Sequence, residues 1–118
     1  MTGNVLLFAG VATADLALAL PWYERFMGRP ADVRVHAGEV MWQICDGGWI
    51  YLVVDPGRAG RALVTVAVPD LDRTVAEMAA RGVAPPAIET IEEAGRKATI
   101  VDPEGNSIAC IEVPARDD

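Results

Sequence analysis

An internal repeat constrains this chain more than any single residue. The stretch from Gly10 to Leu16 reads GVATADL, and the stretch from Thr65 to Leu71 reads TVAVPDL. Valine, alanine, aspartate and leucine stand at the same places in both copies, and each copy runs from an apolar strand pattern into a helix pattern. A repeated supersecondary unit predicts a fold of two similar modules.

Each module is predicted to have the order strand, helix, strand, strand, strand. Asp15 and Asp70 precede the two helices and are suited to cap them, because a carboxylate accepts a free N–H of the first turn. Asp46-Gly47 is a favoured hairpin dipeptide. The predicted strands are residues 5–12, 33–36, 40–44, 49–54, 63–68, 87–91, 96–101 and 107–113, and the predicted helices are 16–27 and 71–81.

The length of 118 residues suits one domain. We expect module one to span residues 1–56, a linker 57–61 and module two 62–113. The net charge of −7 argues against nucleic acid or an anionic membrane surface as a partner, since both attract clustered Lys and Arg. The apolar start lacks a basic region and is too short for a signal peptide or a membrane span, so we expect a cytoplasmic protein.

Two cysteines, Cys45 and Cys110, stand apart and form no CxxC pair. We expect both to be reduced and packed as small hydrophobic residues. A nucleophilic role would need an activating partner, and His36 is the only histidine.

Several motifs together resemble those of a known superfamily. They are the paired V-x-x-x-D-L helix starts, Trp22-Tyr23 followed by Met27-Gly28, and the turn Asp102-Pro103-Glu104-Gly105-Asn106 before the last strand. In this order the chain resembles the vicinal oxygen chelate superfamily, which includes glyoxalases, extradiol dioxygenases and bleomycin resistance proteins. The resemblance implies an α+β fold in which two βαβββ modules form a cupped, partly open mixed β-sheet barrel, with the helices outside and the cup as the site.

The resemblance also implies where a metal would be bound. Metal-dependent members carry histidine or glutamate at positions that correspond here to Phe8, Leu63 and Ala109, with a fourth ligand in some members at about Tyr51. These side chains are unsuited to a divalent cation, which needs imidazole or carboxylate groups. We therefore expect no metal and no other cofactor.

The nearest alternative metal ligands are His36, Glu39 and Glu112. His36 has no counterpart in the other module, and it is expected to be a solvated edge residue, with a role as acid or base as the alternative. Glu112 has the opposite strand parity from Ala109 and should point away from the cup.

Strand alternation predicts the lining of the cup. If Asp46-Gly47 forms the hairpin tip, Ile44 pairs with Trp49 and Trp42 pairs with Tyr51. An aromatic, mostly apolar cup of this kind suits a small planar molecule, although the same aromatic residues could instead form a filled core. The predicted ligand-binding residues are Phe8, Trp42, Trp49, Tyr51, Leu63, Thr65, Ser107 and Ala109.

Three further residues have two interpretations each. Tyr23 is expected to pack its helix on the sheet rather than to touch a ligand. Arg96 and Lys97 begin a predicted cup strand, where one of them could reach an acidic ligand group or both could be exposed rim charges.

These observations favour a metal-independent small-molecule-binding protein that sequesters a hydrophobic or aromatic compound. The alternative is a divergent metal-free enzyme, such as a lyase or isomerase, that uses Tyr51, His36 or an arginine. A third hypothesis is a chain that only dimerises. The resemblance implies a homodimer in all three cases, and two-fold pairing is the commonest oligomeric form.

Overall fold

The computed structural model describes residues 1–114 and contains two copies of one βαβββ arrangement. The elements of the first copy are β1 (Leu7–Thr13), α1 (Leu16–Met27), β2 (Val33–His36), β3 (Glu39–Cys45) and β4 (Gly48–Val54). Those of the second copy are β5 (Leu63–Ala67), α2 (Leu71–Ala80), β6 (Ile88–Ile91), the short 3₁₀ helix η1 (Glu92–Ala94), β7 (Gly95–Val101) and β8 (Ser107–Glu112).

The repeat in the sequence is therefore a repeat in the fold. The first sheet has the strand order β1-β4-β3-β2 and the second sheet β5-β8-β7-β6, so equivalent strands take equivalent places. In each sheet the strand before the helix lies parallel to the last strand of its copy, and the other neighbours are antiparallel. The sheets do not close on each other, and the predicted α+β fold of two βαβββ modules in an open arrangement is confirmed.

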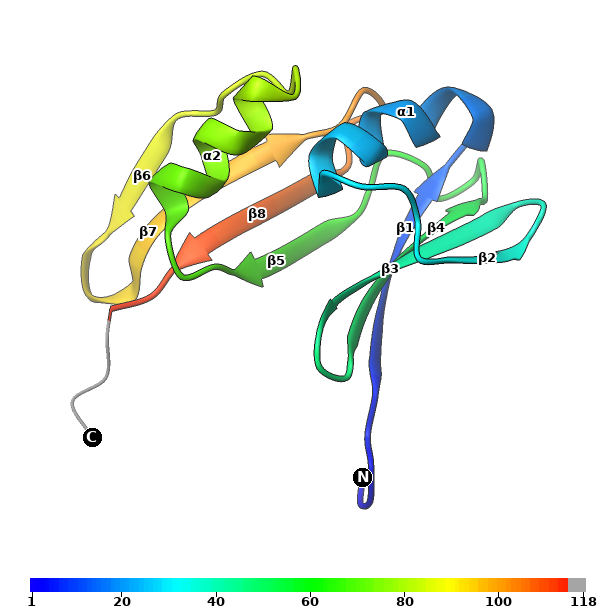
Figure 1. Cartoon of the computed structure of the whole chain (residues 1–118), viewed down its shortest axis with the longest axis horizontal. Helices are drawn as coiled ribbons and strands as arrows, with labels where there is room; N and C mark the ends of the chain where they lie inside the picture. The colour runs from blue at the N-terminus through cyan, green and yellow to red at the C-terminus, as the bar shows by residue number, and fades with distance from the viewer. Residues whose placement is uncertain (115–118) are drawn as a thin grey trace.

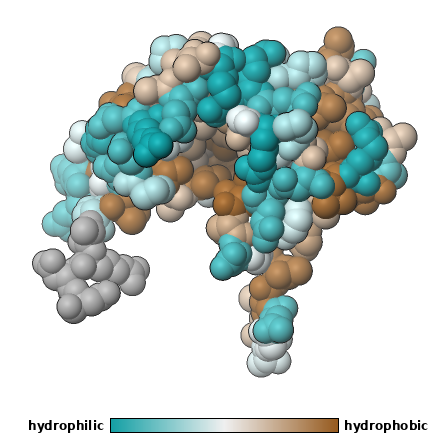
Figure 2. Space-filling view, in the orientation of Figure 1, coloured by the Kyte–Doolittle hydropathy of each residue, from teal (hydrophilic) through white to brown (hydrophobic). Residues whose placement is uncertain are grey.

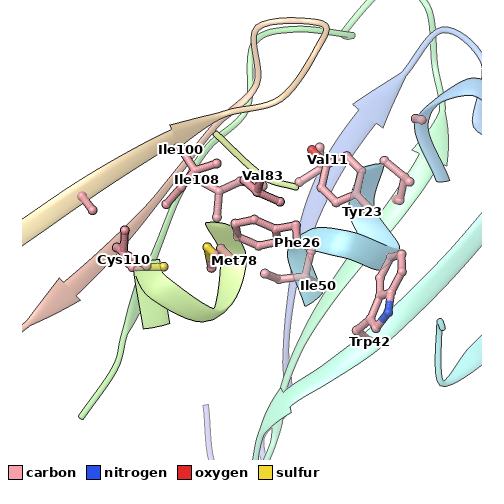
Figure 3. Packing of buried hydrophobic residues seen from close by; sticks show 14 of the residues in the cluster. Val11, Tyr23, Phe26, Trp42, Ile50, Met78, Val83, Ile100, Ile108 and Cys110 are labelled. Carbon is pink, nitrogen blue, oxygen red and sulfur yellow. The ribbon is translucent and has the colours of Figure 1, made fainter. Parts of the chain in front are cut away.

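Both helices lie on the same side of the molecule, between and above the two sheets (Figure 1). One continuous hydrophobic cluster joins α1 and α2 to both sheets. Within it Phe26 of α1 and Met78 of α2 lie between Ile50 of the first sheet and Ile108 of the second (Figure 3). The helix-facing sides of the sheets therefore form the core of the described chain.

The predicted helix caps are confirmed. The Asp15 carboxylate accepts a hydrogen bond from the backbone N–H of Leu18 at 3.2 Å, and the Asp70 carboxylate accepts one from Arg73 at 3.1 Å. Each bond satisfies a first-turn N–H that has no partner inside its helix. The aspartate of the repeat thus starts both helices.

The register between β3 and β4 differs from the prediction by one residue. Gly47 turns the hairpin with φ of 72°, but an irregularity between Gln43 and Cys45 sets Gln43, not Ile44, opposite Trp49. A bulge adds one residue to one strand, and beyond it every side chain on that strand changes face. Trp42 therefore pairs with Ile50 and not with Tyr51.

The turn between β7 and β8 ties the second copy to the first. Asn106 is fully buried, and its side-chain amide donates to the backbone oxygen of Ala12 at 3.0 Å and accepts from the N–H of Ala62 at 2.9 Å. Asp102 is also buried and accepts hydrogen bonds from the Tyr23 hydroxyl and from Asn106. Buried polar groups require such partners, so this turn holds the end of β1 and the start of β5 in one arrangement.

Residues before β1 extend away from the body of the molecule (Figure 1). Figure 2 shows apolar residues along this projecting segment, where Leu6 is 57% exposed. In the part of the chain that the structure describes, no helix has the length and apolar character needed to cross a membrane.

Candidate functional site

The first sheet turns one face away from both helices. Because residues directly opposite each other share a face, the pairs Phe8–Trp49 and Gly10–Tyr51 lie together on this side. The rings of Phe8 and Trp49 stack with centroids 6.2 Å apart, and Phe8 remains 46% exposed. We call this side, with Val53, the open face of the first sheet.

The second sheet has an equivalent open face. Leu63 lies opposite Ser107, and Thr65 lies opposite Ala109. Leu63 is 85% exposed, whereas Ala109 is buried by its neighbours. The structure thus puts seven of the eight predicted site residues on the two open faces, as strand alternation indicates, and their contact with a ligand stays a prediction.

Trp42 is the exception, and its predicted place in the cup is wrong. Its side chain is fully buried on the helix-facing side, where its indole N–H donates to the backbone oxygen of Arg29 at 3.0 Å. Its ring centroid lies 6.3 Å from that of Tyr23. The bulge at Ile44 reverses the face of Trp42, so this tryptophan belongs to the core. Tyr23 packs its helix on the sheet, as expected.

The Tyr51 ring occupies space that only a glycine at position 10 leaves open. A Cβ atom built on Gly10 would come within 2.5 Å of both Cζ and the hydroxyl oxygen of Tyr51. The phenol ring therefore lies directly on the glycine backbone, a close approach that no larger residue permits. The Tyr51 hydroxyl makes no hydrogen bond to another residue of the described chain, 1–114.

A pocket of about 290 Å³ opens beside this ring, at the end of the open face where the chain crosses from β4 to β5. Apolar residues of the sheet line it together with three charged residues that follow β4, two of them in the linker. The sequence predicts only a loop for this linker. It does not predict which loop residues line the pocket, because no periodicity relates a loop residue to a sheet face. The lining residues are Gly10, Ala12, Tyr51, Val53, Asp55, Arg58, Arg61 and Ala62.

The Asn106 network supports this pocket from behind. Ala12 and Ala62 stand on opposite modules, and both are pocket residues whose backbone is bonded to the Asn106 amide. The side chain that joins the two modules therefore also sets the separation of two pocket walls. The motif Asp102–Asn106 predicts the turn. The role of Asn106 between the two modules follows only from the fold.

The metal positions implied by the superfamily resemblance do not fit a metal in this chain. Phe8, Leu63 and Ala109 have no side-chain donor atom, which leaves only the Tyr51 phenol. Within residues 1–114 no group of three His, Cys, Asp or Glu side chains is arranged to hold an ion. The donor set thus disagrees with a bound divalent cation, and the absence of a metal in the protein stays a prediction.

Glu112 points to the helix side, as its parity predicts. It accepts from the backbone N–H of Leu71 at 2.9 Å, at the start of α2, and lies 3.3 Å from Arg96. Arg96 also binds Asp72 at 2.9 Å and holds the pKa of that carboxyl below its usual range. Arg96 is therefore occupied away from the open face, whereas Lys97 lies opposite Ile111, on the open face.

The remaining candidate groups lie outside the pocket. His36 is exposed on β2, and its Nδ1 accepts a hydrogen bond from the Gly38 N–H at 3.0 Å. Cys110 is buried, and burial raises the pKa of its thiol, which opposes nucleophilic chemistry. Cys45 is exposed, so its predicted packing is wrong: it lies at the hairpin next to the bulge.

Among solved structures, one relative decides the family. The chain is 40% identical to a glyoxalase / bleomycin resistance protein from Catenulispora acidiphila DSM 44928, with 93% of this chain and 99% of that chain covered at a TM-score of 0.87. The chain belongs to the glyoxalase / bleomycin resistance family. This family lies within the vicinal oxygen chelate superfamily, so the resemblance is confirmed.

More distant structures share the fold. A bleomycin-binding protein complexed with bleomycin is 23% identical, with 92% of this chain and 98% of that chain covered and a TM-score of 0.73. An antibiotic-binding protein from Streptomyces sp. CB03234 is 24% identical, with 97% and 99% covered and a TM-score of 0.71. No family model matches the chain. No curated protein sequence matches it.

Proposed function

We propose that this protein binds a small organic molecule without a metal, with Tyr51 on Gly10 as the centre of the site. The observation that carries this proposal is the pocket of about 290 Å³ formed beside the Tyr51 ring on an open sheet face. An apolar floor with a few polar groups is typical of ligand sites. Two more distant structures with this fold are a bleomycin-binding protein complexed with bleomycin and an antibiotic-binding protein. Their names support the proposal of small-molecule binding.

The ligand is proposed to have an apolar or aromatic part. Phe8, Trp49 and Tyr51 present aromatic surface along one face, and stacking on such rings contributes about 1 kcal/mol per contact beyond area burial. Sequestration then follows from burial and stacking alone, and no reaction is needed. The proposed site comprises Phe8, Trp49, Tyr51, Leu63, Thr65, Ser107 and Ala109, together with the pocket residues.

A homodimer is part of the proposal. The open faces expose large apolar side chains, among them Phe8, Leu63 and Val101. Contiguous exposed apolar surface is commonly covered by a partner, and a second copy would supply a matching face. Analytical ultracentrifugation tests this point: we expect a dimer at micromolar concentration, and a monomer throughout contradicts it.

The binding proposal is tested by titrating planar aromatic compounds and following tryptophan fluorescence. We expect saturable quenching in the micromolar to millimolar range, because association entropy offsets much of the burial of a small ligand. Trp49→Ala should weaken binding, whereas Trp22→Ala, on the helix side against Phe26, should leave it unchanged. Treatment with a chelator should have no effect. Absence of saturable binding across the panel contradicts the proposal.

A further inference from the structure

We propose that the pocket beside Tyr51 selects ligands with a negatively charged group, such as an aromatic carboxylate, and that Arg61 is its ion-pairing partner. This inference rests on the proposed binding function and specifies the ligand class. It is carried by the charges at the pocket rim, by the free hydroxyl of Tyr51 and by the size of the pocket.

The rim carries more positive than negative charge. Asp55 and Arg58 neutralise each other, with Nε and Oδ2 3.6 Å apart, and the Arg58 N–H also donates to the Asp55 backbone oxygen at 3.0 Å. Arg61 lines the same pocket and makes no ion pair within residues 1–114. In a chain of net charge −7, this pocket therefore leaves one cation without a counterion.

Three other arginines of the described chain are already engaged. Arg29 pairs with Asp32 at 2.9 Å, and Arg73 pairs with Glu77 at 2.9 Å. Arg81 donates to backbone oxygens at the end of α1. Each of these side chains is bonded within the fold, whereas Arg61 lines a pocket and makes no ion pair in the described chain.

The second polar group of the pocket is the Tyr51 hydroxyl. It can donate a hydrogen bond and has no partner in the described chain, as noted above. A carboxylate accepts bonds from both a guanidinium and a hydroxyl, and such charge-assisted bonds are stronger than neutral ones. Both donors line the same pocket, and the proposal assigns them to one anionic group.

The rest of the pocket suits an apolar body. Its floor consists of Gly10, Ala12 and Val53 beside the Tyr51 ring. The volume of about 290 Å³ is at the small end of ligand pockets, which span about 300–1,000 Å³. A bicyclic aromatic acid has the matching combination of one flat apolar part and one charged end.

The experiment compares two probes of equal shape, 2-naphthoate and 2-naphthamide, by isothermal titration calorimetry at neutral pH and low salt. We expect wild-type protein to bind the acid about three- to tenfold more tightly than the amide, the range for a partly exposed ion pair with a hydrogen bond. Added salt should reduce this preference because it screens the pair.

Arg61→Gln is the decisive variant, with Arg34→Gln as its control. Arg61 is exposed, so its replacement should leave the circular dichroism spectrum unchanged. Arg34 is exposed on β2, lies opposite the buried Val40 and does not line the pocket. We expect Arg61→Gln to abolish the preference for the acid while amide affinity persists, and Arg34→Gln to retain it.

The outcomes separate this inference from the function on which it rests. If wild-type protein binds neither probe nor any planar compound of the wider panel, the binding function itself is wrong. If both probes bind equally, or if Arg61→Gln keeps the preference, the binding function stands and the assignment of Arg61 is overturned. A preference lost equally in Arg34→Gln also overturns it, because long-range charge would then explain the effect.

Discussion

The two sides of the same strands differ in almost every physical respect. On the helix side, Val11, Trp42 and Leu52 are fully buried, and one cluster spans both modules. On the open side, Phe8 and Leu63 are exposed, and the pocket at the junction is lined by Arg61, which makes no ion pair within the part of the chain that the structure describes. Alternate residues of one strand thus serve either the core or the open face.

Because the two sides differ in this way, effects on stability and effects on binding should be separable. The helix side has partners for its buried polar side chains in the described chain, so changes there should alter folding. On the open side, the Tyr51 hydroxyl and the Arg61 guanidinium have no partner among residues 1–114, so changes there should alter binding.

Trp42→Ala and Trp49→Ala form the sharpest pair. Removing the buried Trp42 leaves a cavity and an unpaired Arg29 carbonyl, so we expect a loss of about 3–5 kcal/mol in the free energy of unfolding. Trp49 is half-buried and stacks on an exposed ring, so its loss should cost about 1 kcal/mol. Urea denaturation measures both, and equal losses would mean that the open face is core as well.

Asn106→Ala tests the link between the modules. The substitution leaves the Ala12 carbonyl and the Ala62 N–H without their buried partner. Each unsatisfied group costs about 1–3 kcal/mol, so we expect a loss of at least about 2 kcal/mol. Ligand affinity should also fall, because both alanines line the pocket.

The exposed Asn4→Ala is the control for Asn106→Ala in both urea denaturation and ligand titration. A stability change below about 0.5 kcal/mol for Asn106→Ala, the usual range for an inert surface site, would contradict the structural role of this amide.

Tyr23→Phe removes the hydroxyl that donates to Asp102. We expect a loss of about 1.5–3 kcal/mol at pH 7, the value of a hydrogen bond to a charged group. Burial and the Asp102 carboxylate raise the pKa of Tyr23 above its ordinary value. A raised pKa contributes stability below the unfolded value of about 10, which is lost as pH rises further.

The stability difference between wild-type protein and Tyr23→Phe should therefore be constant near neutral pH and shrink above pH about 10. Thermal denaturation of both proteins across this range measures the difference. A gap that widens with alkaline pH would contradict the assigned hydrogen bond.

Gly10→Ala should have the smallest effect on stability and a clear effect on binding. The new methyl group would displace the far end of the Tyr51 side chain, which can swing away at little cost. We expect a change in the free energy of unfolding within about 0.5 kcal/mol and a loss of ligand affinity comparable to that of Tyr51→Ala. Unchanged affinity would show that the position of the ring on Gly10 is irrelevant to binding.

Much of the fold follows from the sequence because the repeat and the alternation are regular. The matched helix starts predict both modules. In β1, β5 and β8 the pairing is uninterrupted, so alternation predicts the sheet face of Phe8, Leu63 and Ala109 correctly. The face of Trp42 could not be predicted, because one inserted residue in β3 has no sequence signal distinct from its neighbours. The shared face of Trp49 and Tyr51 follows from alternation along β4, because that strand carries no bulge.

The polar parts of the candidate site could not be predicted in the same way. Arg58 and Arg61 lie in the linker, where no period relates sequence to a face. Asn106 was assigned to a turn from its motif, but its bonds to Ala12 and Ala62 depend on how the modules pack. Arg96 was a candidate for an acidic ligand group, and only the structure shows that Asp72 and Glu112 engage it.

We propose that ligands bind on the open face and not within the helix-side core. The helix side also contains a cavity, of about 230 Å³, lined in part by Phe26, Met78 and Cys110. Amide chemical-shift mapping by NMR during titration with 2-naphthoate distinguishes the two places directly. We expect shifts concentrated at Gly10, Tyr51 and Arg61, whereas shifts concentrated at Phe26, Met78 and Cys110 would contradict the account.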